Sequence, residues 1–104
     1  MNAVSAALYA EQPTPTTHDL PLRRGGFATL TAALDYAAQG ATGCNFYDAR
    51  GTLVRALPYR ELRREARRHA RRLHAMGLPR GSRVALVAET HPDFVALLLG
   101  CQYA

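Results

Sequence analysis

The sequence predicts an α/β fold whose last two elements need neighbours that the preceding residues do not supply. Residues 82–104 read SRVALVAETHPDFVALLLGCQYA, which indicates a strand, a turn and an almost wholly apolar helix. An unbroken apolar run is typical of a strand that is covered on both faces of a parallel sheet. A short helix, a β-hairpin and an amphipathic helix precede it, and none of them offers a parallel strand. We therefore expect the chain to be an incomplete, opening portion of a larger α/β fold.

Two parts are expected along the chain. Residues 1–21 contain three prolines among Thr and Gln, which predicts a flexible leader, and residues 22–104 form the partial domain. The apolar run near the start has no basic flank, so it is a poor signal peptide. No run approaches the ~20 apolar residues that a membrane span needs. These observations predict a cytoplasmic protein without a membrane span.

The first elements are a helix and a hairpin. Apolar residues recur at helical spacing from Thr29 to Gln39, and Gly40 is a natural stop. Strands are expected at 45–47 and 52–56, around a turn in which Gly51 supplies a positive φ. Because two short strands are marginal alone, this hairpin must pack against another element.

A long amphipathic helix is expected next, over 59–76. Pro58 suits the first turn of a helix, Glu61 favours the positive end of the helix dipole, and Gly77 ends it. Steps of three and four residues define its apolar face. The members of this face are Tyr59, Leu62, Ala66, Ala70, Leu73 and Met76.

The final βα unit begins with a buried strand from Arg83 to Ala88. Thr90 is the expected N-cap of the last helix, Pro92 an early helical residue, and Asp93 a favourable charge in the first turn. Apolar side chains surround this helix on nearly every side, so it needs cover on more than one side. They are Phe94, Val95, Leu97, Leu98, Leu99, Cys101 and Tyr103.

The basic residues are unusual in kind and position. All 13 are Arg, there is no Lys, and the net charge is +5. The chain therefore has no lysine for a Schiff base, a phosphate-binding loop or general base catalysis. Most of the charge lies in the helix at 59–76, where like charges four residues apart oppose one another. The arginines form two columns, Arg60, Arg64, Arg68 and Arg72, and Arg63, Arg67 and Arg71.

Two interpretations of these columns remain open. Glu61 and Glu65 are expected to offset part of the repulsion through Arg64 and Arg68, which leaves a solvated outer face. The alternative is a small Arg-rich binding module for nucleic acid or anionic lipid. No aromatic residue is interleaved with the arginines for base stacking, which favours the solvated face and no nucleic-acid partner.

The remaining reactive residues form no recognisable site. The histidines, His18, His69, His74 and His91, fall into no metal-ligand spacing. Cys44 and Cys101 are far apart and are expected to be free, buried thiols. Ser82 has no nucleophile-elbow context, and the paired glycines open no phosphate-binding helix. We therefore assign no catalytic, cofactor-binding or metal-binding residue.

One long segment carries a family resemblance. It is LPYRELRREARRHARRLHAMGLPRGSRVALVAETHPDFVALLLGCQYA, and it resembles the N-terminal region of adenylate-forming enzymes. The shared features, in order, are YREL at 59–62, the Gly-rich connector from Gly77 to Val84, and the Pro-Asp-Phe phrase at 92–94. The stretch TLTAALDYAAQGATGCNFYDARG and the ending GCQYA look most like fatty-acyl-AMP ligases. Where the family often has a capping Ser or Thr, this chain has Pro58.

The resemblance implies that residues 22–104 are part of the large N-terminal domain of that superfamily. It implies a parent enzyme that uses ATP and Mg2+ to convert a fatty acid to an acyl-adenylate. The acyl group then passes to a carrier-protein or coenzyme A thiol. In the family the catalytic, adenine-binding and metal-binding motifs lie downstream, so this segment is expected to be scaffold, to bind no cofactor and to be inactive alone. A domain excerpt, a truncated gene and an independent product all remain open.

Overall fold

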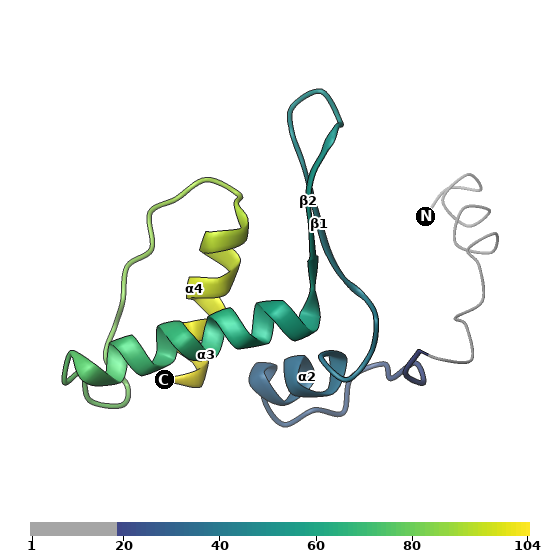
Figure 1. Ribbon diagram of the computed structural model, residues 1–104. Helices are drawn as coiled ribbons and strands as arrows, with labels where there is room; N and C mark the ends of the chain where they lie inside the picture. Colours follow the sequence, from purple (N-terminus) through teal and green to yellow (C-terminus); the bar gives the residue numbers. More distant parts are fainter. Residues whose placement is uncertain (1–18) are drawn as a thin grey trace, which may run out of the picture.

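The computed structural model describes residues 19–104, and residues 1–18, with most of the expected leader and His18, lie outside that range. The elements in chain order are helix α2 (Leu30–Ala37), strands β1 (Gly43–Tyr47) and β2 (Leu53–Pro58), and helices α3 (Tyr59–Ala75) and α4 (Pro92–Tyr103). Figure 1 shows α3 as the long helix against which α2, the hairpin and α4 are arranged.

Helix α2 confirms the expected first helix, with an end two residues earlier. The hydroxyl of Thr29 accepts a hydrogen bond from the backbone N–H of Ala32 at 3.1 Å, which caps the first turn. Gly40 follows in a turn and is buried, and a Cβ there would lie 2.6 Å from Asp19 Oδ1. The absence of a side chain at Gly40 therefore lets Asp19 and Leu20 pack closely, and no positive φ is involved.

The hairpin is longer than expected, and its turn is as expected. Asp48 Oδ1 accepts backbone hydrogen bonds from Arg50 and Thr52 at 2.9 and 3.0 Å, and Gly51 has φ +80°. A bulge at Phe46/Tyr47 shifts the antiparallel register. The buried side chains Phe46 and Leu57 anchor this two-stranded ribbon to the core.

Helix α3 buries the predicted apolar face over most of its length. Leu62, Ala66 and Ala70 are buried, whereas Met76 is the C-cap residue and is 71% exposed, so its place on that face was wrong. Gly77 follows with φ +77°, as the C-terminal signal predicted. Pro58 occupies the N-cap position, and the backbone N–H of Tyr59 donates to Thr42 O at 3.0 Å.

Helix α4 packs directly on α3. A Cβ at Gly100 would lie 2.8 Å from the Cβ of His69 and 2.9 Å from the carbonyl oxygen of Ala66. This close approach lets Ala96 and Leu99 join the core that α3 and the hairpin form. The full core cluster is Leu34, Phe46, Leu57, Leu62, Ala66, Ala96 and Leu99.

The expected strand from Arg83 to Ala88 forms no ladder within residues 19–104, in line with the expectation that the preceding residues do not supply its neighbours. This segment has no ladder partner, and the sheet of residues 19–104 contains β1 and β2 only. Val84 is 42% and Val87 98% exposed, so the expected burial is also absent. The physical reason is that a strand forms only when a neighbour accepts its backbone hydrogen bonds. In Figure 1 the segment arches away from α3 before it enters α4.

The cap of α4 differs from expectation, whereas its incomplete cover agrees with it. His91, not Thr90, is the N-cap, and its Nδ1 accepts the backbone N–H of Asp93 at 3.1 Å. Pro92 takes the first helical position, as predicted. One side of α4 is buried on α3, while Leu98 remains 41% exposed. Among residues 19–104, no helix is long and apolar enough to cross a membrane.

Replacement of Gly100 by Ala tests the close packing of α3 and α4. The added methyl group must displace His69 or the α3 backbone, and we expect a net loss of about 1–2 kcal/mol despite the better helix propensity of Ala. Thermal unfolding followed by circular dichroism measures this loss. Gln102→Ala, at an exposed position of the same helix, is the control. An unchanged or higher melting temperature for Gly100→Ala would contradict the packing.

Candidate functional site

One cluster of polar side chains joins three helices. Asp35 on α2 accepts a hydrogen bond from Arg63 Nε at 2.6 Å and another from the Tyr103 hydroxyl at 2.6 Å, both at Oδ1. The Tyr103 hydroxyl also lies 3.4 Å from the backbone oxygen of Thr31. A single carboxylate thus connects the N-terminal part of α3 to the last turn of α4.

This arrangement shifts the pKa values of all three groups. The hydrogen bonds from Arg63 and then Tyr103 hold the pKa of Asp35 below its usual value, and Asp35 in turn raises the pKa of Arg63. Burial first, and then Asp35, raise the pKa of Tyr103 to about 12. Because the side chains of Asp35 and Arg63 are each more than a third exposed, their ion pair contributes only about 0.2–1 kcal/mol to the free energy of unfolding. The cluster therefore holds the helices in position. Because Asp35 is already bound to Arg63 and Tyr103, it is not free to act as a general base.

A second cluster corrects the expected pairing of the α3 glutamates. Glu61 and Glu65 both bind Arg55 Nη2 on β2, each at 3.2 Å. These two carboxylates therefore hold the hairpin to α3 instead of offsetting Arg64 and Arg68. The expected pairing of each glutamate with the arginine three residues later was wrong, because Arg55 on β2 reaches both carboxylates. This contact is visible only in the tertiary structure.

The arginines of α3 lie mainly on its outer side. Arg63 is half-buried against Asp35, and the other six, Arg60, Arg64, Arg67, Arg68, Arg71 and Arg72, are exposed. Within residues 19–104 no carboxylate lies within ion-pair distance of these six. In this part of the chain these six side chains are therefore exposed and without an ion pair.

The histidines and cysteines serve local packing. His69 is half-buried where α4 approaches, His74 is exposed, and His91 caps α4. Cys44 and Cys101 are free and half-buried. Burial first, and then the Cys44 thiol, raise the pKa of Tyr59. Residues 19–104 contain no group of three His, Cys, Asp or Glu placed to hold a metal ion.

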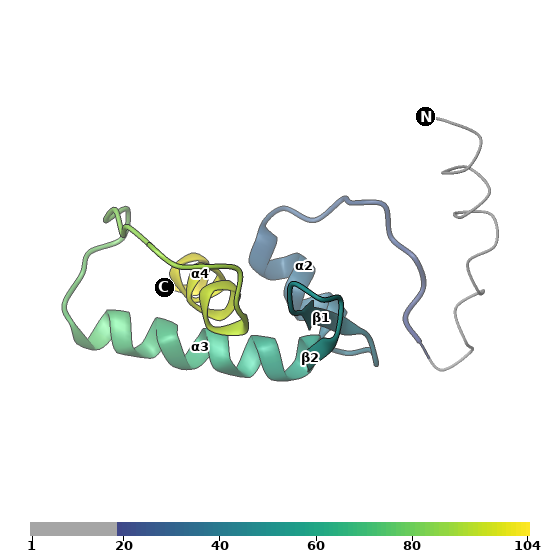
Figure 2. The ribbon, with the colours of Figure 1, turned by 90° about the horizontal axis from the view of Figure 1, so that it is seen from above.

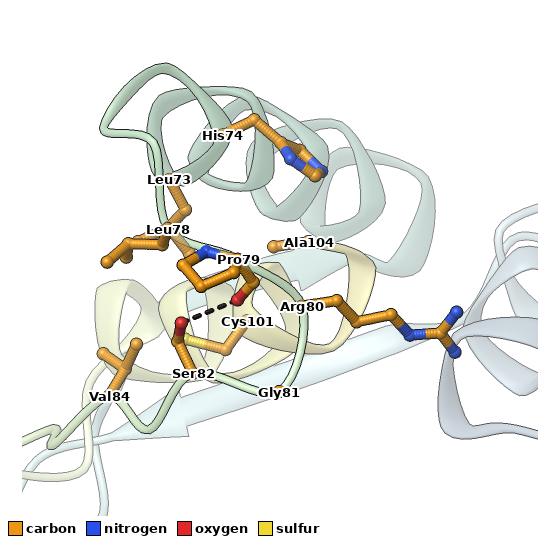
Figure 3. A pocket seen from close by; sticks show the side chains of 10 residues that line it. All are labelled: Leu73, His74, Leu78, Pro79, Arg80, Gly81, Ser82, Val84, Cys101 and Ala104. Carbon is orange, nitrogen blue, oxygen red and sulfur yellow. Dashed lines mark hydrogen bonds between the residues drawn. The ribbon is translucent and has the colours of Figure 1, made fainter.

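A small pocket lies between the end of α3, the following connector and the end of α4. Its volume is about 80 Å³, and Figure 3 shows the Arg80 side chain extending away from it. Ser82 Oγ donates a hydrogen bond to Pro79 O at 2.6 Å, so this hydroxyl stabilises the connector. The volume is well below the roughly 300 Å³ of a typical ligand site, and this pocket does not define a substrate site.

The remaining distinctive surface is the extended apolar segment from Arg83 to Ala88. Its backbone groups lack a sheet partner and Val84 and Val87 face solvent, although the residue pattern is that of an internal strand. Unpaired apolar edges are sites for strand addition. The segment and the uncovered side of α4 are therefore exposed apolar surfaces of the described residues.

These features define an α/β unit of three helices and one hairpin in residues 19–104, whose ion pairs position its own elements. Residues 38–104 match the family model described as AMP-binding enzyme, and the chain belongs to this family. The predicted α/β portion of the adenylate-forming fold is thereby confirmed.

Two relatives illustrate the match. A Caulobacter vibrioides protein named "Putative acyl-CoA synthetase" is 56% identical over 91 residues, which are 88% of this chain and 16% of that protein. A solved structure described as "Structural and Functional Studies of Fatty Acyl-Adenylate Ligases from E. coli and L. pneumophila" is 47% identical, with a TM-score of 0.76. The match covers 80% of this chain and 15% of that one. The chain thus spans about one sixth of the length of these relatives.

Sequence reasoning missed the residues that join the elements. Asp35 and Arg55 received no role, and Tyr103 was placed only among the apolar side chains of the last helix. Each of the three makes a contact between elements that are distant in sequence. One signal was available for Arg55, an isolated charge within an otherwise apolar strand. No local pattern identifies Asp35 as the partner of Arg63.

The Tyr103 phenol makes the free energy of unfolding depend on pH in the alkaline range. Its folded pKa of about 12 exceeds its ordinary value of 10.0, so its contribution is present below pH 10 and is lost as pH rises toward 12. We expect the urea midpoint of the unmodified chain to fall more steeply over this range than that of Tyr103→Phe. Tyr47→Phe, at an exposed tyrosine, is the control. Parallel curves for Tyr103→Phe and the unmodified chain would contradict the cluster.

The exposed segment predicts self-association of the isolated chain. Val87→Lys places a charge on the unpaired edge and should shift sedimentation-velocity profiles toward monomer. Thr90→Lys adds the same charge at an exposed position outside the apolar run. A monomeric unmodified chain, or an equal effect of the two substitutions, would show that the segment does not drive association.

Proposed function

We propose that this chain is a scaffold segment of an enzyme that activates a fatty acid with ATP and Mg2+, and that it is inactive alone. The observation that carries the proposal is the 56% identity to the Caulobacter vibrioides protein over nearly the whole chain. The 47% identity to a structure from a study of fatty acyl-adenylate ligases supports the fatty-acid branch.

The proposed chemistry has two group transfers. The fatty-acid carboxylate attacks the α-phosphorus of ATP and forms an acyl-adenylate, with pyrophosphate as the leaving group. A carrier-protein or coenzyme A thiol then attacks the acyl carbon and releases AMP. The groups that bind ATP and Mg2+ belong, in this proposal, to the remainder of the parent enzyme, which is the chief partner of this chain.

Several features of the described residues support a scaffold role. Asp35, Glu61 and Glu65, the carboxylates on α2 and α3, are all bound to arginines of this chain. Mg2+ needs oxygen ligands such as carboxylates that face a common space, and residues 19–104 contain no group of three His, Cys, Asp or Glu placed to hold a metal ion. The segment from Arg83 to Ala88 provides a strand for the sheet of the parent. This proposed enzyme is cytoplasmic.

A chimera tests the proposal. The 91 matching residues of the Caulobacter vibrioides protein are replaced by those of this chain, and fatty-acid-dependent ATP–pyrophosphate exchange is measured. We expect exchange within about threefold of that relative's own rate, because a scaffold supplies shape and no reacting group. The isolated chain should show no exchange.

Two controls complete the experiment. The relative without the matching residues should be inactive, because its sheet loses a strand. A folded chimera that loses exchange by about a hundredfold or more would contradict the scaffold role. Exchange by the isolated chain would show that catalytic groups lie within it.

A further inference from the structure

Four exposed arginines of α3 share one helix face. Arg60, Arg64, Arg67 and Arg71 stand at positions i, i+4, i+7 and i+11, a spacing that places side chains in one line along a helix. We call this line the arginine seam. It is roughly 16 Å long at 1.5 Å per residue, and together with Arg63 it lines a shallow hollow.

The carboxylates nearest in sequence do not neutralise the seam. Glu61 and Glu65 are bound to Arg55 on β2, and Asp35 is bound to Arg63. Within the described range, no ion pair involves a seam residue. Figure 2 shows no described element over the side of α3 opposite α4.

The seam opposes the helix that carries it. Like charges at i,i+4, as at Arg60 and Arg64 or Arg67 and Arg71, each destabilise an exposed helix by a few tenths of a kcal/mol. The buried residues Leu62, Ala66 and Ala70 hold α3 in place despite this repulsion. An external line of negative charge would remove the repulsion and gain guanidinium–carboxylate hydrogen bonds.

We propose that the arginine seam is a docking surface for an acidic helix of a partner protein. Glutamates at the same i, i+4, i+7, i+11 spacing on a second helix would meet the four guanidinium groups one to one. A single-stranded nucleic acid would be favoured by aromatic side chains among the arginines, but Tyr59, the aromatic residue of α3, packs on the core. A lipid surface would be favoured by large exposed apolar residues beside the arginines, but Leu62 is buried and the exposed Met76 lies at the C-cap, beyond the seam. The proposal does not depend on the acyl-activation chemistry.

Fluorescence anisotropy with a labelled peptide tests the docking surface. The probe is an Ala-rich helical peptide with four glutamates at the seam spacing, and its control is a peptide of the same composition with the glutamates scrambled. At about 50 mM salt we expect the patterned peptide to bind the full chain about tenfold more tightly than the scrambled one. This preference should decrease at higher salt.

Two variants with equal charge loss separate position from net charge. Replacement of Arg60, Arg64, Arg67 and Arg71 by Gln should abolish the tenfold preference, since Gln keeps helix propensity and removes the charges. Replacement by Gln of four exposed arginines outside α3 should preserve this preference. They are Arg24, Arg50, Arg80 and Arg83. Circular dichroism checks that both variants remain folded.

Three results would overturn the proposal. The first is equal binding of the patterned and scrambled peptides to the unmodified chain. The second is an equal loss of preference in the two variants. The third is tighter binding of a labelled oligothymidine, or of vesicles that contain phosphatidylglycerol, than of the patterned peptide, which would assign the seam to nucleic acid or lipid.

Discussion

The close approach of α4 to α3 is the constraint on which the rest of the structure depends. Ala66 and Ala70 on α3, and Gly100 on α4, have side chains small enough for the two backbones to meet. This contact brings Ala96 and Leu99 into the core, and that core also receives Phe46 and Leu57 from the hairpin. A bulkier residue at the crossing would therefore disturb more than one helix, because the core is small and its members touch one another.

The charged residues of α3 fall into two groups, those that bind other elements of this chain and those that are exposed. Arg63 binds α2 through Asp35, and Glu61 and Glu65 bind the hairpin through Arg55. These pairs position elements at the sides of α3, while the outer arginines remain free for interactions beyond the described residues. Partly exposed ion pairs contribute little energy, so their main effect is to set the orientation of elements that apolar contacts stabilise.

Family membership explains why an internal-strand sequence is exposed in this chain. Residues 38–104 belong to the AMP-binding enzyme family, and the chain spans about one sixth of the length of its relatives. A segment of that size retains local helices and a hairpin, whose hydrogen bonds are made within short stretches. The segment at 83–88 has the sequence of an internal strand but no ladder partner in residues 19–104, and a strand forms only beside neighbouring strands.

The sequence by itself determined the helices, the hairpin turn, the inner face of α3 and the family. These depend on local periodicity and on glycines at turns, such as Gly51 and Gly77. Only the tertiary structure decided that Arg55 takes both α3 glutamates and that Asp35 links Arg63 to Tyr103. It also decided that the segment from Arg83 to Ala88 stays unpaired. The physical reason is that ion pairs and strand ladders join residues distant in the chain, whereas caps, turns and helix faces are set by neighbours within about four residues.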